Sequence, residues 1–160
     1  MSAQFEKLLP ALVQAKVEFI LIGGVAGTVH GSSRLTYDVD VVYARTTANY
    51  NQMAEALQPY APYLRGAPPG LPFTLDAATL RNGLNFTLTT ELGDLDLLGE
   101  VVGGGGYGDL LSHTVEVEAF GVKLKCVDLP TLIILKRAAG RPKDLESLAE
   151  LEALLKERRE

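Results

Sequence analysis

Two aspartates, Asp38 and Asp40, interrupt an apolar run of β-branched residues. Side chains two positions apart on a β-strand point to the same face of the sheet, so these carboxylates are expected to project side by side. Neighbouring carboxylates repel one another and lose hydration unless a cation lies between them. A divalent metal ion would satisfy both. The alternative is that one aspartate caps a turn while the other is solvated at the end of the strand.

A third carboxylate strengthens the metal interpretation. Asp96 lies in a second apolar run and has a leucine on each side, so its burial calls for compensation. Three carboxylates can hold two divalent ions, which would activate a hydroxyl and stabilise a leaving phosphate. Ligation by oxygen alone favours Mg²⁺, with Mn²⁺ as an alternative, over zinc. Asp94 follows the predicted turn at Gly93, and we interpret it as the solvated acid of this run.

The segment before the two aspartates offers groups that suit a phosphate. Gly23 and Gly24 end an apolar run and lead into a short helical segment, where free backbone amides can hold an anion. Ser32 and Ser33 can donate to the same phosphate, although polar residues are also common in turns. Arg34 can contact phosphate, pair with one of the two aspartates, or form a structural salt bridge.

Basic residues gather near the end of the chain, at Lys136, Arg137, Arg141 and Lys143. They form either a patch that faces phosphate or a solvated corner between two helices. The net charge of the chain is −5, which disfavours binding to nucleic acid through bulk positive charge.

The elements that must position these residues follow from hydrophobic periodicity and turn residues. The pattern predicts helices over 3–15, 25–30, 47–58 (with Thr47 as its cap), from 129 to about 140, and over about 145–155. It predicts strands over 17–22 and 37–43, and hairpins over 84–98 and 115–127. A proline-rich loop is expected over 59–72 and a flexible glycine-rich loop over 103–108. This order predicts one α/β (α+β) domain over residues 1–160, with a mixed, twisted sheet flanked by helices.

Composition narrows the setting. The single cysteine, Cys126, cannot form an internal disulfide and lies in an apolar run, so we expect it to be buried in a protein of a reducing compartment. No apolar run approaches the length of about 20 residues needed to span a bilayer. We therefore expect a cytoplasmic protein without a membrane partner.

The order of these motifs resembles the polymerase-beta-like nucleotidyltransferase superfamily. The resemblance is carried by the glycine pair, the pattern Arg34-x-Thr36-x-Asp38-x-Asp40 and the later strand with Asp96. Residues 136–145 resemble the tail motif of its bacterial branch, which includes the AbiEii-type toxins and short minimal relatives.

This resemblance implies a role for each matching residue. Gly23 and Gly24 would contact the triphosphate of the incoming nucleotide. The metal would be ligated by Asp38, Asp40 and Asp96. Lys136 would lie near the nucleotide phosphates, and Arg141, Lys143 and Asp144 would complete that region. Asp96 would also help to deprotonate the acceptor hydroxyl.

The function that follows is transfer of a nucleoside monophosphate from a nucleoside triphosphate to a hydroxyl acceptor by a two-metal mechanism, with Mg²⁺ as the expected ion. The acceptor can be a protein, a tRNA or a small molecule. Two alternatives stay open. One is a catalytically inactive or regulatory module that binds nucleotide or a partner protein. The other is a toxin–antitoxin component that modifies tRNA or protein and has an antitoxin partner.

Overall fold

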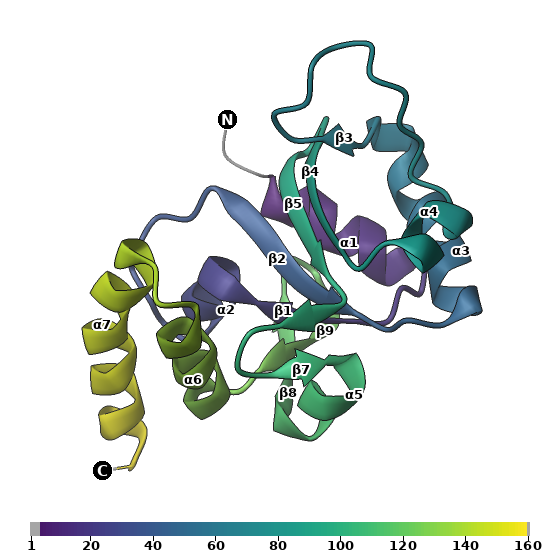
Figure 1. Ribbon diagram of the computed structural model, residues 1–160. Helices are drawn as coiled ribbons and strands as arrows, with labels where there is room; N and C mark the ends of the chain where they lie inside the picture. Colours follow the sequence, from purple (N-terminus) through teal and green to yellow (C-terminus); the bar gives the residue numbers. More distant parts are fainter. Residues whose placement is uncertain (1–3, 160) are drawn as a thin grey trace.

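The computed structural model describes residues 4–159, and its centre is a mixed β-sheet. Within these residues, seven strands join one sheet in the order β3-β4-β5-β2-β1-β9-β8 (Figure 1). The strands are β1 (Phe19–Ile22), β2 (Asp38–Tyr43), β3 (Tyr63–Leu64), β4 (Asn85–Thr90), β5 (Gly93–Leu98), β8 (Thr114–Ala119) and β9 (Val122–Val127). The pairs β1–β9 and β2–β5 are parallel and the other pairs are antiparallel. The predicted mixed sheet is confirmed.

Two groups of helices pack on this sheet. One group consists of α1 (Phe5–Gln14), α3 (Thr47–Leu57) and α4 (Ala77–Asn82), and the other of α2 (Gly23–Val29), α6 (Leu129–Ala139) and α7 (Pro142–Arg159). Figure 1 shows the first group at the right and the second at the left of the sheet. Among the described helices, none is long and apolar enough to cross a membrane.

Alternation along the central strands separates a dry face from a polar face. Val39 and Val41 of β2, and Leu95 and Leu97 of β5, are fully buried and belong to the main hydrophobic core. The acids between them project from the opposite face, because successive side chains of a strand alternate. β1 is buried at all four positions, as its unbroken apolar run predicts. Cys126 on β9 is also buried, as expected.

The second helix group is fastened at its far end by His30. The Arg158 guanidinium of α7 donates to His30 Nδ1 over 3.1 Å and to the His30 backbone carbonyl over 2.8 Å. The ring proton therefore sits on Nε2, which donates to the Val127 carbonyl over 2.7 Å. Burial, opposed by this hydrogen bond, lowers the pKa of His30. His30 thus joins α2, β9 and α7.

The chain departs from the predicted elements between α3 and β4. The helix α3 is capped by Thr46, whose side chain accepts from the Asn49 amide, and not by Thr47. The region expected to be loop contains a 3₁₀ turn (Gln58–Tyr60) and the edge strand β3. The unassigned α4 begins after Asp76, whose carboxylate accepts from the Thr79 amide over 2.8 Å. The aspartate directly before this segment was a usable cap signal.

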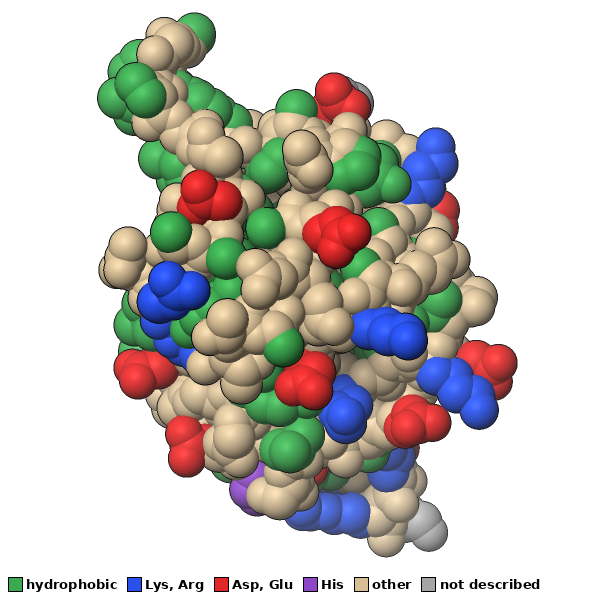
Figure 2. Space-filling view, turned by 90° about the vertical axis from the view of Figure 1, so that its right-hand side faces the viewer, with side chains coloured by type: hydrophobic (Ala, Val, Ile, Leu, Met, Phe, Trp, Pro, Cys, Tyr) green, Lys and Arg blue, Asp and Glu red, His purple; other side chains and the backbone are tan. Residues whose placement is uncertain are grey.

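The segment between β3 and α4 protrudes from the body of the molecule (Figure 1). Figure 2 shows this protrusion at the top of the viewed face, with apolar side chains near its tip. Leu71, which belongs to this segment, is exposed. Over the rest of that face, acidic and basic side chains are scattered singly. No charged region dominates the face in Figure 2.

The glycine-rich segment is a packed ribbon where we expected a flexible loop. It forms β6 (Glu100–Val101) and β7 (Gly105–Gly106), which are paired, followed by α5 (Tyr107–Leu110) and a 3₁₀ turn (Leu111–His113). The glycines of this segment allow close packing against neighbouring side chains and a left-handed backbone conformation. A Cβ at Gly103, where φ is +84°, would lie 2.6 Å from the Ala138 Cβ of α6. The glycine content of the sequence does not distinguish a flexible loop from a closely packed ribbon.

Candidate functional site

The three predicted acids converge on the polar face of the sheet. β2 and β5 are parallel neighbours with Asp40 opposite Asp96 and Asp38 opposite Asp94. Carboxylate oxygens of Asp38, Asp40 and Asp96 lie within 4.8 Å of one another, and all three residues are half-buried. Two strands far apart in sequence thus bring the acids to separations that a bridging metal requires.

Burial and the crowding of the three carboxylates raise the pKa values of Asp38 and Asp40 on β2. Burial, together with the Asp96 and Asp38 carboxylates, raises the pKa of Asp40 well above its usual range. Burial and the Asp96 carboxylate also raise the pKa of Asp38, against an opposing contribution from Lys143. Without a metal, the cluster therefore holds its negative charge at a cost. A divalent cation would relieve that cost.

One oxygen of the Asp96 carboxylate lacks a hydrogen-bond donor among residues 4–159. Its Oδ1 atom is buried and accepts no hydrogen bond from the described residues. The nearest positive group is a terminal nitrogen of Arg65 at 2.9 Å, close enough for an ion pair but not in hydrogen-bond geometry. A buried carboxylate oxygen without a donor is suited to a metal ion, and a set of oxygens alone suits Mg²⁺ or Mn²⁺.

The glycine pair is packed closely against the strand that carries Asp40 and the residues before it. Gly23 has φ of +72°, and a Cβ at this position would lie 2.1 Å from Asp40 Oδ2. A Cβ at Gly24 would lie 2.6 Å from the Thr36 hydroxyl oxygen. Only glycine allows the start of α2 to approach the acids this closely. The structure thus gives Gly23 a packing role toward Asp40 and Gly24 one toward Thr36, while contact of the pair with a triphosphate stays a prediction.

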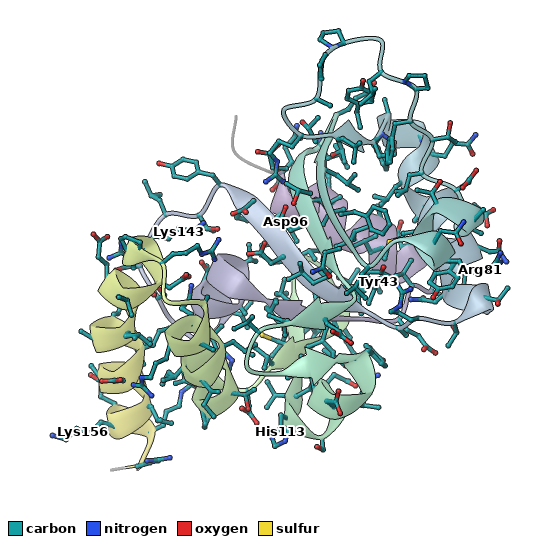
Figure 3. All side chains as sticks on the ribbon, in the orientation of Figure 1. Tyr43, Arg81, Asp96, His113, Lys143 and Lys156 are labelled. Carbon is teal, nitrogen blue, oxygen red and sulfur yellow. The ribbon has the colours of Figure 1, made fainter. Side chains whose placement is uncertain are left out.

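The acids open into a cleft of about 520 Å³ between the sheet and the second helix group. Among the predicted site residues, the cleft is lined by Gly23, Gly24, Arg34, Asp38, Asp40, Asp96, Lys136 and Lys143. Ser33 is the one predicted site residue that is not part of this lining. In Figure 3, Lys143 lies at the start of α7 and points across the cleft toward the strand that carries Asp96.

The basic wall of the cleft is organised by a buried acid at the α6–α7 corner. Arg141 Nε donates to Asp144 Oδ2 over 2.7 Å, and Lys136 Nζ lies 3.7 Å from Asp144 Oδ1. Burial lowers the pKa of Lys136, although Asp144 and Asp40 oppose this. Arg137 is exposed, pairs with Glu152 and does not line the cleft. Three of the four predicted basic residues therefore face the acids, and the fourth belongs to the solvated corner.

The loop between α2 and β2 is attached to α7. The Ser33 hydroxyl donates to Glu150 over 2.9 Å, and Ser32 donates to the other oxygen of the same carboxylate. An Arg34 terminal nitrogen lies 3.2 Å from Glu146, so the salt-bridge interpretation of this arginine is the one observed. The alternative, a pair between Arg34 and one of the two aspartates, is absent from the described contacts.

Arg65 is the site residue that sequence reasoning missed. It follows β3, inside the segment predicted to be loop, and reaches both acids of β5. Its contact with Asp94 shows that this acid is paired and half-buried, which corrects the expectation that it is solvated. Nothing in the proline- and glycine-rich sequence around Arg65 indicated an edge strand next to β4.

Comparison with solved structures identifies the fold. A candidate nucleotidyltransferase from Thermotoga maritima aligns with 96% of this chain and 91% of its own, with a TM-score of 0.54 and 14% identity. The lincosamide antibiotic adenylyltransferase LnuA, solved with lincomycin bound, aligns over 96% of this chain and 98% of its own, with a TM-score of 0.62 and 14% identity.

The chain therefore has the fold of these nucleotidyltransferases, which confirms the predicted fold class. No protein-family model matches the sequence, and comparison with curated protein sequences finds no relative. Assignment to the AbiEii-type branch stays a prediction.

Proposed function

We propose that this protein transfers a nucleoside monophosphate from a nucleoside triphosphate to a hydroxyl acceptor. The observation that carries the proposal is the convergence of Asp38, Asp40 and Asp96 within 4.8 Å, in a cleft whose opposite wall is basic. The nucleotidyltransferase fold supports the same activity.

The reaction would form a bond between the acceptor oxygen and the α-phosphorus and break the bond to pyrophosphate. Divalent ions held by the three carboxylates would lower the pKa of the acceptor hydroxyl and neutralise the leaving pyrophosphate. Asp96 would take up the acceptor proton. We propose Mg²⁺ as the ion, bound as a pair, with Mn²⁺ as a substitute.

The remaining cleft residues would bind the triphosphate. Lys136 and Lys143 would neutralise its phosphates from α6 and α7, and the backbone at Gly23 and Gly24 would approach it from α2. Arg34 lines the cleft, and its guanidinium could turn from Glu146 to phosphate, because the present pair is exposed and therefore weak. Ser33 would have to release Glu150 before it could join them.

LnuA guides the choice of substrates to test, since it is an adenylyltransferase with lincomycin bound. We propose ATP as the first nucleotide and a small hydroxyl compound as the first class of acceptor. Proteins and tRNA stay in the panel, and an antitoxin partner and a cytoplasmic location stay predictions.

The test is a screen of the four radiolabelled triphosphates with Mg²⁺ against small hydroxyl compounds, cell-extract proteins and total RNA. The expected result is label transfer that EDTA abolishes and that Asp40→Asn loses. Glu55→Gln is the matched control, because Glu55 is exposed on α3 and does not line the cleft. Mg²⁺-dependent nucleotide binding without transfer to any acceptor would instead support the inactive binding module.

A further inference from the structure

Arg65 contacts the third carboxylate from outside the cleft. One of its terminal nitrogens lies 2.9 Å from Asp96 Oδ1 and donates to the Leu88 carbonyl over 2.7 Å. Its Nε atom lies 3.4 Å from Asp94 Oδ2. Arg65 is not among the residues that line the cleft, so it acts on the acids and not on a substrate.

The position of Arg65 is fixed by the sheet. Its backbone amide donates to the Thr87 carbonyl over 3.0 Å, which continues the pairing of β3 with β4 past the last strand residue. Thr87 is directly opposite Asp96 in the β4–β5 register. Register therefore aligns the arginine with the acid that it contacts, with one residue of β4, Thr87, between them.

The two acids that Arg65 contacts need a shared counter-charge. Asp94 and Asp96 are opposite Asp38 and Asp40 across parallel strands, so four carboxylates occupy one face of two adjacent strands. A guanidinium has a planar array of donors that can reach two carboxylates and a carbonyl together, whereas the ammonium of lysine is a single point charge. Without this arginine, repulsion would move Asp96 away from the other acids.

We propose that Arg65 is a positioning residue that holds the Asp96 carboxylate within reach of Asp38 and Asp40, so that metal binding depends on it. The inference rests on the proposed function for its kinetic consequence only. Its main readout is binding of a metal to the chain in the absence of nucleotide.

The experiment measures Mn²⁺ binding by titration with electron paramagnetic resonance detection. Arg65→Met should weaken binding about 10–100-fold, the range seen when a partner of a metal ligand is removed. Arg65→Lys should fall between Met and the parent, because it restores charge but not the array of donors. Arg81→Met is the matched control, since Arg81 is exposed on α4 (Figure 3) and should leave affinity unchanged.

Circular dichroism tests whether each variant is folded. If Arg65→Met is unfolded, the Mn²⁺ affinity of Arg65→Lys alone decides whether Arg65 positions Asp96. Parental affinity in a folded Arg65 variant would overturn the positioning role while leaving the proposed function in place, and tighter binding would show that Arg65 competes with the metal. If the parent chain binds no Mn²⁺ without nucleotide, the positioning role fails, whereas the proposed function is decided separately by label transfer. Once an acceptor is known, Arg65→Met should lower kcat more than it raises the KM for the triphosphate.

Discussion

Asp40→Asn should make the metal-free protein more stable while it removes metal binding. At 4.8 Å, two unit charges repel by about 1 kcal/mol in bulk water and by about 3 kcal/mol at an effective dielectric constant of about 20. The Asp40 carboxylate is half-buried and Lys143 offsets part of the repulsion, so we expect a net gain of about 1–2 kcal/mol. For a domain of this size, that raises the thermal midpoint by about 2–8 °C.

The gain should depend on pH in a definite direction. The pKa of Asp40 is raised in the folded state, mainly by burial and then by Asp96. Below the unfolded carboxyl pKa of about 4, Asp40 is protonated in both states and causes no loss. As pH rises through the folded pKa, the folded parent must ionise Asp40 and loses stability. The advantage of the asparagine variant should therefore be small near pH 4 and greatest at neutral and higher pH.

The assay is thermal unfolding in EDTA across this pH range, repeated with Mg²⁺. Saturating Mg²⁺ at 100-fold above its Kd should stabilise the parent by about 2.7 kcal/mol and leave the variant unchanged. Glu55→Gln should follow the parent throughout. A variant that melts at or below the parent in EDTA at pH 8 would refute the claim that repulsion among these acids strains the metal-free fold.

Three other outcomes follow from the structure. Gly23→Ala should lower the thermal midpoint more than Gly70→Ala and abolish the shift caused by Mg²⁺. Both glycines have positive φ, but only the new Cβ at position 23 would collide with a carboxylate, 2.1 Å from Asp40 Oδ2. Lys143→Gln should weaken triphosphate binding, measured by calorimetry, by about tenfold or more, while Lys156→Gln at the far end of α7 leaves it unchanged. Burial lowers the pKa of His30, so the parent should lose stability as pH falls below about 6.5, and melts of His30→Asn should show a smaller loss.

Sequence reasoning worked best where local pattern and tertiary structure agree. Apolar runs interrupted by acids identified β2 and β5, and because a parallel register joins these strands, Asp38, Asp40 and Asp96 meet as the pattern implied. The helix α6 was predictable from start to end, since Asp128 caps its first turn and Gly140 takes the left-handed conformation at its end.

The rest depended on pairing that no local signal encodes. β3 has two residues and pairs only at the sheet edge, so neither periodicity nor propensity could indicate it, and Arg65 was missed with it. The partners of Ser33 and Arg34 lie more than 110 residues away on α7. A serine or arginine beside a glycine turn suggests phosphate binding, but it does not show whether a distant carboxylate already holds the side chain.

The late position of α7 in the chain has a consequence for the timing of activity during synthesis. The acids of β2 and the basic residue Lys143 face the same cleft, although about 100 residues separate them. At a synthesis rate of about 5–20 residues per second, roughly 5–20 s pass between translation of the two walls. A nascent chain that ends before α7 carries the acids and Lys136 but lacks Lys143, so the proposed triphosphate site is incomplete until the last helix is made. The proposed transfer would therefore depend on docking of the last helix.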